Sequence, residues 1–374
     1  MVNLAPRHQL HLLSFAETPQ ELSQAGPLGK LCQSIETVEI PSRSPLKRAL
    51  SLLLSPQPDM ALRLDSKKFK RTLRERVRRE DFDVVQVEGI EMAHYIERLF
   101  HREGTARPLL VYDAHNAEYV LQRRAFETDL ADPRRWVGAL YSLIQWQKLQ
   151  RYEARVLRSF DRVVAVSPAD RYALERLVPG LEIEVVPNGV DTDLFQPMAS
   201  REGETLVFTG KMDFRPNVDA VVWFCEKVLP LLRKRLPQLR FYIVGQSPHR
   251  RVLSLAKDPQ IVVTGRVEDD RPFMAQARLY VAPLRVGGGT RLKILRAMAM
   301  GKAIVATSLA CEGIELSGGE VLLADTPQAF AEAILELWDD PARRQKLGQR
   351  GRALMEARYD WRSIVPKLEE VYAQ

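Results

Sequence analysis

Three consecutive glycines followed by a hydroxyl and two cations form the clearest chemical pattern in the sequence. They lie in RVGGGTRLKILRAMAMGK, residues 285–302, directly after the apolar run LYVAPL. Glycines let the backbone approach a ligand closely, and a helix beginning near Thr290 offers free N–H groups to an anion. Cations in a first helical turn oppose the helix dipole, so an anionic ligand would compensate for them. The pattern predicts a phosphate or carboxylate site, with an ordinary glycine turn as the alternative, at Gly287, Gly288, Gly289, Thr290, Arg291 and Lys293.

Two other groups of polar residues follow apolar runs. His115 and Asn116 come directly after LLVYDA, and they are candidate catalytic residues. Gly210, Lys211 and Asp213 follow TLVFT, and they are candidates for phosphate binding. The alternative for each is an ordinary structural or solvated side chain.

Glu118 and Glu88 are weaker candidates. Glu118 is also explained as an acid in the first turn of a helix, where the dipole favours it. Glu88 follows VVQV and is a candidate for the acceptor side of the site. Asn188 and Gly189 form a turn pair that we assign to a hinge, with a simple turn as the alternative.

The elements that must position these residues are short strands alternating with helices. Each run is apolar on both faces and ends in Gly, Ser, Asp or Asn, as parallel strands covered on both sides do. The fold class is therefore α/β, with two doubly wound, Rossmann-like parallel sheets facing a cleft. The expected strands lie within residues 8–15, 35–40, 81–88, 109–115, 162–167, 182–188, 205–210, 240–245, 261–265, 279–284, 303–308 and 320–325.

Linker composition divides the chain. PNGVDTDLFQPMASREGE collects turn residues without apolar periodicity, so we place the hinge at 189–203. The expected N-terminal domain is 1–188 and the expected C-terminal domain is 204–355. Residues 356–374 are expected to form a final helix that returns toward the N-terminal domain.

Length and composition fit a two-domain globular protein. The chain has 374 residues, 45% hydrophobic and 28% charged. Cys32, Cys225 and Cys311 stand far apart, which indicates neither a disulfide framework nor a zinc site. No apolar run approaches the length of a membrane-spanning helix, and no secretory signal pattern opens the sequence. A reducing cytoplasm is the expected location.

The positive charge is concentrated between Arg43 and Arg79. The formal net charge is +7, but this segment alone holds twelve basic residues and three acids. A solvated helix face is one explanation, and a surface that meets anionic lipid is another. PLKRALSLLL, residues 45–54, favours the second because it has the pattern of a short amphipathic helix. Nucleic acid is disfavoured because no recognised binding motif accompanies the charge.

The combined motifs resemble glycosyltransferase family 4. The residues that carry the resemblance are DAHNAE, VVPNGVDTDLF, TGKMDFRPNVDAVVWF and GGGTRLKILRAMAMGKAIVAT, in the family's order. The resemblance runs from about residue 8 to the C-terminus and belongs to the GGGTRLK subgroup. It implies the two-domain GT-B fold and transfer of a sugar from a nucleotide diphosphate donor, with retention at the anomeric carbon and no metal or other cofactor.

The resemblance also implies roles for the site residues and a biological setting. The glycine loop would hold the diphosphate, and Arg291 or Lys293 would neutralise charge on the departing nucleotide. The acceptor would be a carbohydrate or a lipid-linked sugar in cell-surface polysaccharide or glycolipid assembly. The enzyme would then be cytoplasmic, peripheral at the inner face of the membrane, and bound there through Arg43–Arg79.

Arg296 departs from the family pattern. The family usually has glutamates where this chain has Gly288 and Arg296, and the second glutamate accepts hydrogen bonds from the donor ribose. Arginine has five donors and no acceptor, so it cannot make those contacts. Three explanations stay open: an extra anionic group on the donor, a weakened enzyme, or replacement by a neighbouring acid such as Glu312.

The start of the sequence is a second departure. NLAPRHQLHLL resembles the end of the first helix and the second strand of family members. The first strand and its glycine-rich loop are therefore expected to be missing, which a misplaced start would explain better than a natural truncation.

Rival functions follow from these departures. A noncatalytic or weakened nucleotide-sugar-binding protein is the main alternative. A sugar-nucleotide epimerase shares the architecture, but the GGGTRLK and PNGVD motifs disfavour it, and a nucleic-acid binder is the least favoured.

Overall fold

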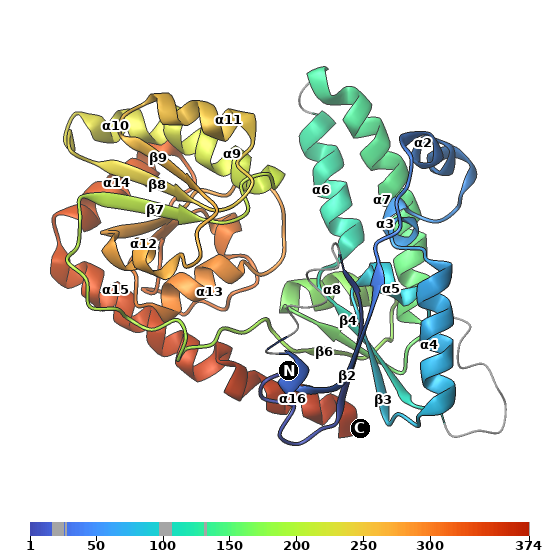
Figure 1. Cartoon of the computed structure of the whole chain (residues 1–374). Coiled ribbons are helices and arrows are strands. Elements are labelled where there is room, and N and C mark those ends of the chain that lie inside the picture. The colour runs from blue at the N-terminus through green and yellow to red at the C-terminus, as the bar shows by residue number, and fades with distance from the viewer. Residues whose placement is uncertain (17–25, 27, 97–106, 131–132, 374) are drawn as a thin grey trace. The chain divides into compact units, whose positions relative to one another are not determined.

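The computed structural model describes residues 1–16, 26, 28–96, 107–130 and 133–373. The chain forms two compact units. Unit 1 comprises Met1–Val186 together with Val365–Gln374, and unit 2 comprises Pro187–Ile364 (Figure 1). No described helix is long and apolar enough to cross a membrane.

Unit 2 is built on one six-stranded parallel sheet with the order β12-β11-β10-β7-β8-β9. Its strands are β7 (Thr205–Thr209), β8 (Arg240–Val244), β9 (Ile261–Gly265), β10 (Leu279–Ala282), β11 (Ile304–Ala306) and β12 (Leu322–Leu323). The chain builds outward from β7 through β8 to β9, and then returns to the other side of β7 with β10. The sheet is therefore doubly wound, with its change of direction between β7 and β10.

Helices cover both faces of the unit 2 sheet (Figure 1). They are α9 (Arg215–Trp223), α10 (Leu229–Arg233), α11 (Arg250–Leu253), α12 (Arg271–Gln276), α13 (Leu292–Ala299), α14 (Pro327–Trp338) and α15 (Pro341–Leu354), with the short turns η3 (Phe224–Val228), η4 (Ser254–Lys257), η5 (Ser308–Cys311) and η6 (Met355–Tyr359). Because both faces are covered, the strands need apolar residues throughout, and Leu206, Val207 and Phe208 are all fully buried.

Unit 1 contains two parallel sheets. Its strands are β1 (Leu10–Ala16), β2 (Cys32–Glu39), β3 (Val84–Glu88), β4 (Leu109–Ala114), β5 (Arg162–Ala165) and β6 (Ile183–Val185). Among the described residues, β1 pairs with β2 alone, and β3 to β6 form a separate sheet in sequence order. The expected parallel α/β architecture is confirmed, and the described strands of this unit are divided between two sheets, since β1 and β3 do not pair with each other. The missing first strand stays a prediction.

The unit 1 helices include one long antiparallel pair, α6 and α7, which lie side by side (Figure 1). Within the described residues that precede unit 2 in the chain, the helices are α2 (Pro45–Leu54), α3 (Asp59–Arg63), α4 (Lys67–Arg79), α5 (Ile90–Ala93), α6 (Glu118–Leu130), α7 (Trp136–Leu157) and α8 (Pro168–Leu177), with η1 (Leu28–Lys30) and η2 (Pro133–Arg135). α16 (Trp361–Ala373) begins in unit 2 and ends in unit 1. Its Glu369 side chain contacts His8 at 2.8 Å, which ties the two ends of unit 1 together.

Candidate functional site

The loops at the carboxyl ends of β7, β8 and β10 form the candidate site of unit 2. β7 lies between β8 and β10, so these loops are neighbours at the point where the strand order reverses. Open parallel sheets bind ligands at this position, because loops on either side of it diverge and leave room. Gly210 follows β7, Gly245 follows β8, and the triple glycine follows β10.

Two of these loops touch through their glycines. A Cβ atom at Gly245 would lie 1.7 Å from the carbonyl oxygen of Gly210, so the backbones can meet only because that atom is absent. A Cβ atom at Gly210 would lie 2.6 Å from Nζ of Lys293 and 2.8 Å from Nδ2 of Asn217. The two glycines therefore bring the backbone next to a cation and an amide.

Lys293 lies under the loops and is held in place. Its Nζ donates to Oδ1 of Asn217 at 2.6 Å and lies 4.0 Å from the centre of the Phe208 ring. Asn217 in turn donates from Nδ2 to the Lys211 carbonyl at 2.8 Å. Burial, with a smaller contribution from Arg291, lowers the pKa of Lys293 well below its ordinary value. A nearby anion would reverse that change by favouring the ammonium form.

The triple glycine packs against the same group. Gly287 has φ of +101°, and a Cβ atom there would lie 2.8 Å from a guanidinium nitrogen of Arg291 and 3.3 Å from Pro216. α13 begins at Leu292, two residues after the expected start, with Arg291 in the capping position. Thr290 places its hydroxyl in a buried position with no partner among the described residues. The loop, Arg291 and Lys293 therefore lie together in a positively charged group of residues that is rich in backbone amides.

The other residues predicted for this site are more exposed. The Lys211 side chain points to the surface, where its ammonium lies 3.6 Å from the carboxylate of Asp213. Arg285, at the start of the glycine loop, binds Asp219 on α9 through two hydrogen bonds of 2.9 and 3.2 Å. That pair fixes the loop against α9.

Arg296 is an exposed residue of α13. Its guanidinium lies 5.0 Å from the centre of the Phe195 ring. Burial raises the pKa of Asp270, and the charge of Arg296 partly offsets that rise.

The predicted hinge residues Asn188 and Gly189 lie next to α16. A Cβ atom at Gly189 would lie 2.7 Å from the Trp361 ring, and Val190 N–H donates to the Tyr359 carbonyl at 2.8 Å. Gly189 is therefore required for close packing, and the hinge role stays a prediction.

Unit 1 has its own polar cluster at the carboxyl ends of β3 and β4. His115 Nε2 lies 2.9 Å from Oε2 of Glu88, and Gln86 donates to the other oxygen of Glu88 at 2.6 Å. Burial opposes ionisation of Glu88, but these hydrogen bonds outweigh it and lower its pKa. The hydrogen bond that His115 donates to Glu88 raises the pKa of His115. Asp113 lies beside them, and burial, with Glu88 nearby, raises its pKa to about 7.

The side chains of two further acids, Glu118 and Glu153, lie at the start of α6. Asn116 Nδ2 donates to Glu118 at 3.1 Å, and burial raises the pKa of Glu118 to about 7. Glu153, fully buried on α7, accepts hydrogen bonds of 3.0 Å from the N–H groups of Glu118 and Tyr119. It thereby caps the first turn of α6, and burial raises its pKa to about 8.

Among the described residues, Glu88, Asp113 and His115 could hold a metal ion, because their ligand atoms lie within 4.8 Å of one another. His115 and Glu88 already hydrogen-bond each other, so the closeness of these two residues does not require an ion. The independence from metal that the sequence indicates stays a prediction.

Comparison with known protein families covers both units. The family described as Glycosyltransferase Family 4 matches residues 4–194, and the one described as Glycosyl transferases group 1 matches residues 203–340. The first match alone spans half of the chain. The chain belongs to glycosyltransferase family 4.

Several curated relatives are mannosyltransferases. The chain is 28% identical over 227 residues to the phosphatidyl-myo-inositol mannosyltransferase of Mycobacterium tuberculosis, covering 56% of this chain and 58% of the relative. It is 26% identical over 258 residues to the GDP-mannose-dependent alpha-(1-6)-phosphatidylinositol monomannoside mannosyltransferase of the same species, covering 61% and 66%. The matched region thus spans under two thirds of these relatives.

Solved structures establish the GT-B fold of this family 4 chain. Sucrose-phosphate synthase from Thermosynechococcus elongatus has a TM-score of 0.68 at 16% identity, covering 98% of this chain and 99% of that one. Anabaena HepE in complex with UDP and glucose has a TM-score of 0.65 at 15% identity, covering 98% and 100%.

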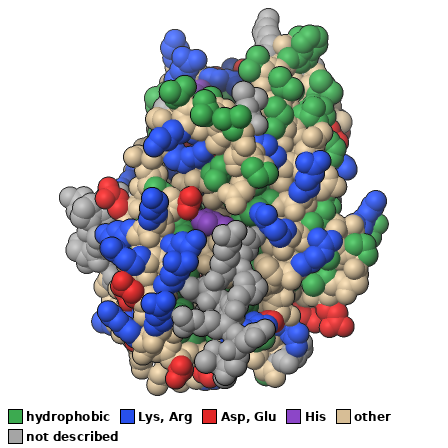
Figure 2. Space-filling model, turned by 90° about the vertical axis from the view of Figure 1, so that its right-hand side faces the viewer, with side chains coloured by type: hydrophobic (Ala, Val, Ile, Leu, Met, Phe, Trp, Pro, Cys, Tyr) green, Lys and Arg blue, Asp and Glu red, His purple; other side chains and the backbone are tan. Residues whose placement is uncertain are grey.

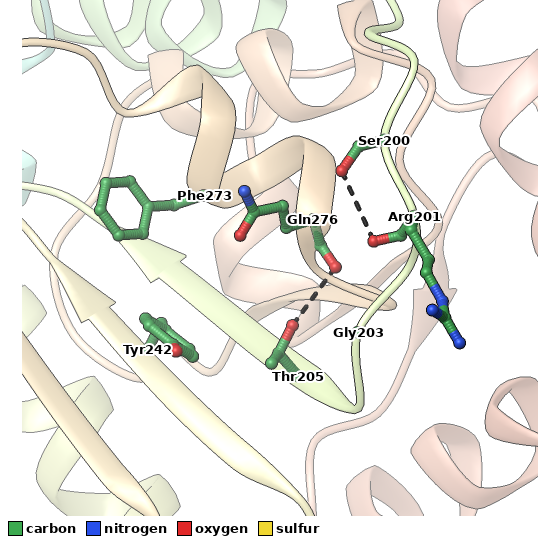
Figure 3. Close-up of a pocket in the computed structure, with 7 residues that line it drawn as sticks. All are labelled: Ser200, Arg201, Gly203, Thr205, Tyr242, Phe273 and Gln276. Carbon is green, nitrogen blue, oxygen red and sulfur yellow. Dashed lines mark hydrogen bonds between the residues drawn. The ribbon is translucent and has the colours of Figure 1, made fainter.

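A hollow elsewhere in unit 2 is not the site expected of a family 4 member. This cavity, of about 310 Å³, lies at the amino end of β7, opposite Gly210 (Figure 3). Tyr242 and Phe273 form its aromatic wall, Thr205 bonds the Gln276 carbonyl, and Arg201 points away from them. Ligands of doubly wound sheets bind at the carboxyl ends, so we assign no donor role to it.

Gly245→Ala should disrupt the unit 2 site of this family 4 protein. The new Cβ atom would overlap the Gly210 carbonyl, and the residue has φ of +152°, so the loops after β7 and β8 must separate. We expect the free energy of unfolding to fall by about 2 kcal/mol or more and nucleotide affinity to fall at least tenfold. Denaturant unfolding and titration with nucleoside diphosphates measure both. Gly29→Ala, with no atom within 4 Å of its Cβ, is the control.

Glu153 should make stability depend on pH. Its folded pKa of about 8 exceeds the ordinary value of 4.5, so between these values the folded state holds a proton that the unfolded state has lost. The free energy of unfolding should therefore fall as pH rises from 5 to 8, by at most about 1.4 kcal/mol per pH unit from this group. Glu153→Gln should reduce this dependence of the free energy of unfolding on pH, whereas Glu226→Gln, at an exposed position, should leave the dependence unchanged. An unchanged slope in Glu153→Gln would contradict the assignment.

Sequence reasoning missed several residues of these clusters, among them Gly245, Glu153, Asn217 and Asp113. Asn217 lies within the quoted TGKMDFRPNVDAVVWF motif, but its contact with Lys293 joins positions far apart in sequence. Asp113 is the fifth residue of the LLVYDA run, and a carboxylate near the end of an apolar strand was the signal that could have found it.

Proposed function

We propose that the protein is a retaining glycosyltransferase that moves a hexose-type sugar from a nucleoside diphosphate to a carbohydrate or lipid-linked acceptor. The observation that carries the proposal is the meeting of Gly210, Gly287, Arg291 and Lys293 at the strand-order reversal of unit 2. A diphosphate fits this group because it supplies the negative charge that two cations near a helix start require.

In this proposal the positive charges of Lys293 and Arg291 stabilise the leaving diphosphate during sugar transfer. As the bond between the sugar and the diphosphate breaks, negative charge grows on the leaving diphosphate. Cations fixed in place beforehand stabilise that charge without reorganising. We assign the leaving-group role to these two residues and the closing of the loops to the glycines.

The acceptor side of the reaction is assigned to unit 1. His115 and Glu88 form a hydrogen-bonded pair that can exchange a proton with an acceptor hydroxyl. Asn116 and Glu118 offer further hydrogen-bonding groups next to it. Polysaccharide or glycolipid assembly at the inner face of the membrane is the setting that we propose, with attachment through Arg43–Arg79.

A nucleotide screen tests the proposal. Thermal unfolding is measured with GDP, UDP, ADP and their sugars, because a ligand that binds only the folded state must stabilise it. GDP-mannose is the first donor to test, since one matched relative is named for its dependence on it. At 100 times Kd we expect about 2.7 kcal/mol of stabilisation. If no nucleoside diphosphate or nucleotide sugar raises the unfolding temperature, the proposal fails.

Arg296 favours a second candidate function, a noncatalytic or weakened nucleotide-sugar-binding protein. An arginine cannot accept hydrogen bonds from ribose hydroxyls. Arg296→Glu distinguishes the two candidates: restored donor affinity with new transfer activity would show that the natural chain is weakened. Transfer by the natural chain that Arg296→Glu leaves equal or reduces would exclude this second function.

A further inference from the structure

α2 presents an apolar stripe to solvent. Leu46, Leu50 and Leu54 recur every four residues, so they lie on one face of the helix. Their exposed fractions are 74%, 56% and 76%. An amphipathic helix on a globular protein normally turns this face toward the core, so the outward face of α2 needs another partner.

Polar contacts hold α2 in this orientation. Arg43 binds Asp59 at 2.8 Å and Ser51 at 2.7 Å. Lys148 on α7 donates to the Leu52 carbonyl at 2.6 Å, near the end of α2 where helix carbonyls lack partners. The polar side of α2 is therefore fixed to unit 1, which leaves the leucines outside.

The first turns of α7 extend the apolar region. Trp136, Val137 and Leu140 are exposed by 60%, 88% and 60%. Lys148 links α7 to the last turn of α2, and Arg48 of α2 also interacts with Tyr141 of α7, so the two helices meet at these side chains. We call the six residues Leu46, Leu50, Leu54, Trp136, Val137 and Leu140 the apolar surface. Figure 2 shows hydrophobic side chains gathered over the upper part of this face.

Basic side chains accompany the apolar surface on α2 and line α4. Lys47 and Arg48 lie between the leucines of α2. α4 carries eight basic residues and one acid, and a hollow of about 370 Å³ along it is lined by Lys67, Lys70, Arg71, Arg74, Glu75 and Arg78. Lys and Arg side chains occupy much of the same face in Figure 2, with few acids among them.

This chemistry selects among partners. A second copy would bring one cationic face against another, which is electrostatically unfavourable. An anionic bilayer offers partners to both kinds of side chain. Its apolar interior can accept leucine and tryptophan, and its negative headgroups can bind lysine and arginine. Tryptophan and tyrosine also favour the boundary between lipid and water.

We propose that the apolar surface inserts into the interfacial layer of an anionic phospholipid bilayer, while the basic face of α4 binds the headgroups. The surface belongs to unit 1 and involves none of the residues assigned to the donor site. The proposal names the structural elements of the membrane attachment suggested above and does not depend on sugar transfer.

Vesicle co-sedimentation of the full chain tests the proposal. The vesicles are phosphatidylcholine, with or without phosphatidylglycerol. We expect binding only with phosphatidylglycerol, and a loss of about tenfold or more in Leu46→Ser/Leu50→Ser/Leu54→Ser. Leu253→Ser/Leu323→Ser, which removes exposed leucines of unit 2, should bind as the natural chain does. Arg71→Gln/Arg74→Gln should bind anionic vesicles about fivefold more weakly for each charge removed, and added salt should reduce that difference.

Several outcomes would overturn the proposal. They are equal binding to vesicles without phosphatidylglycerol, failure of the natural chain to bind either vesicle, and undiminished binding by the triple leucine variant. A dimer in sedimentation velocity that the triple variant abolishes would assign the surface to a second copy instead. The nucleotide-induced thermal shift is measured on each variant, so that loss of folding or of donor binding is recognised separately.

Discussion

Lys293→Met is expected to weaken nucleoside diphosphate binding by about 100-fold without lowering the free energy of unfolding. Truncating one partner of a buried charge pair costs 2–5 kcal/mol of binding, whereas removing a buried ammonium relieves a desolvation cost in the empty protein. Isothermal titration with GDP and UDP, together with denaturant unfolding, measures the two effects. The exposed Lys227→Met is the matched control.

The lowered pKa of Lys293 adds a second readout. Burial lowers the pKa of Lys293 in the empty protein, and a bound diphosphate favours its ammonium form. Binding should then take up protons and strengthen as pH falls through the pKa of the empty site. Titrations in buffers of different ionisation enthalpy detect that uptake. Unchanged affinity in Lys293→Met would remove this residue from the donor site.

His115→Ala is expected to lower kcat for sugar transfer by about 10²- to 10⁴-fold, the usual contribution of a general acid or base. Nucleotide affinity should not change, because the diphosphate group is assigned to unit 2. Transfer assays with the donor identified in the nucleotide screen measure kcat, and nucleotide titration measures the affinity. The exposed His8→Ala is the control.

Glu88→Gln separates a chemical role of His115 from a structural one. The Glu88 hydrogen bond raises the pKa of His115, so its loss should return that pKa toward the ordinary value. The limb of the pH–rate profile that depends on His115 should accordingly move to lower pH. A merely structural role would leave the profile in place. If kcat of His115→Ala equals that of the natural chain, His115 is not catalytic.

Much of the fold could be predicted from the sequence. Every run expected to form a strand contains one, because strands buried on both faces need continuous apolar residues and so stand out in a sequence. PLKRALSLLL forms the expected helix with its expected ends, since Pro45 at its start and the leucine spacing are local signals. Local signals of this kind do not specify which strands pair, and so the separation of β1 and β2 from β3 was not foreseen.

For the candidate site too, some features could be predicted from the sequence and others are seen only in the structure. Glycines, cations and polar residues that follow strands directly can be recognised in the sequence, and Gly210, Gly287, Lys293 and His115 were predicted on that basis. The sequence by itself determined these positions and the family, because strand ends and glycine loops are local. Only the tertiary structure decided that Asn217 holds Lys293, that Gly245 meets Gly210, and that the leucines of α2 face outward, because these depend on contacts between residues far apart in the chain.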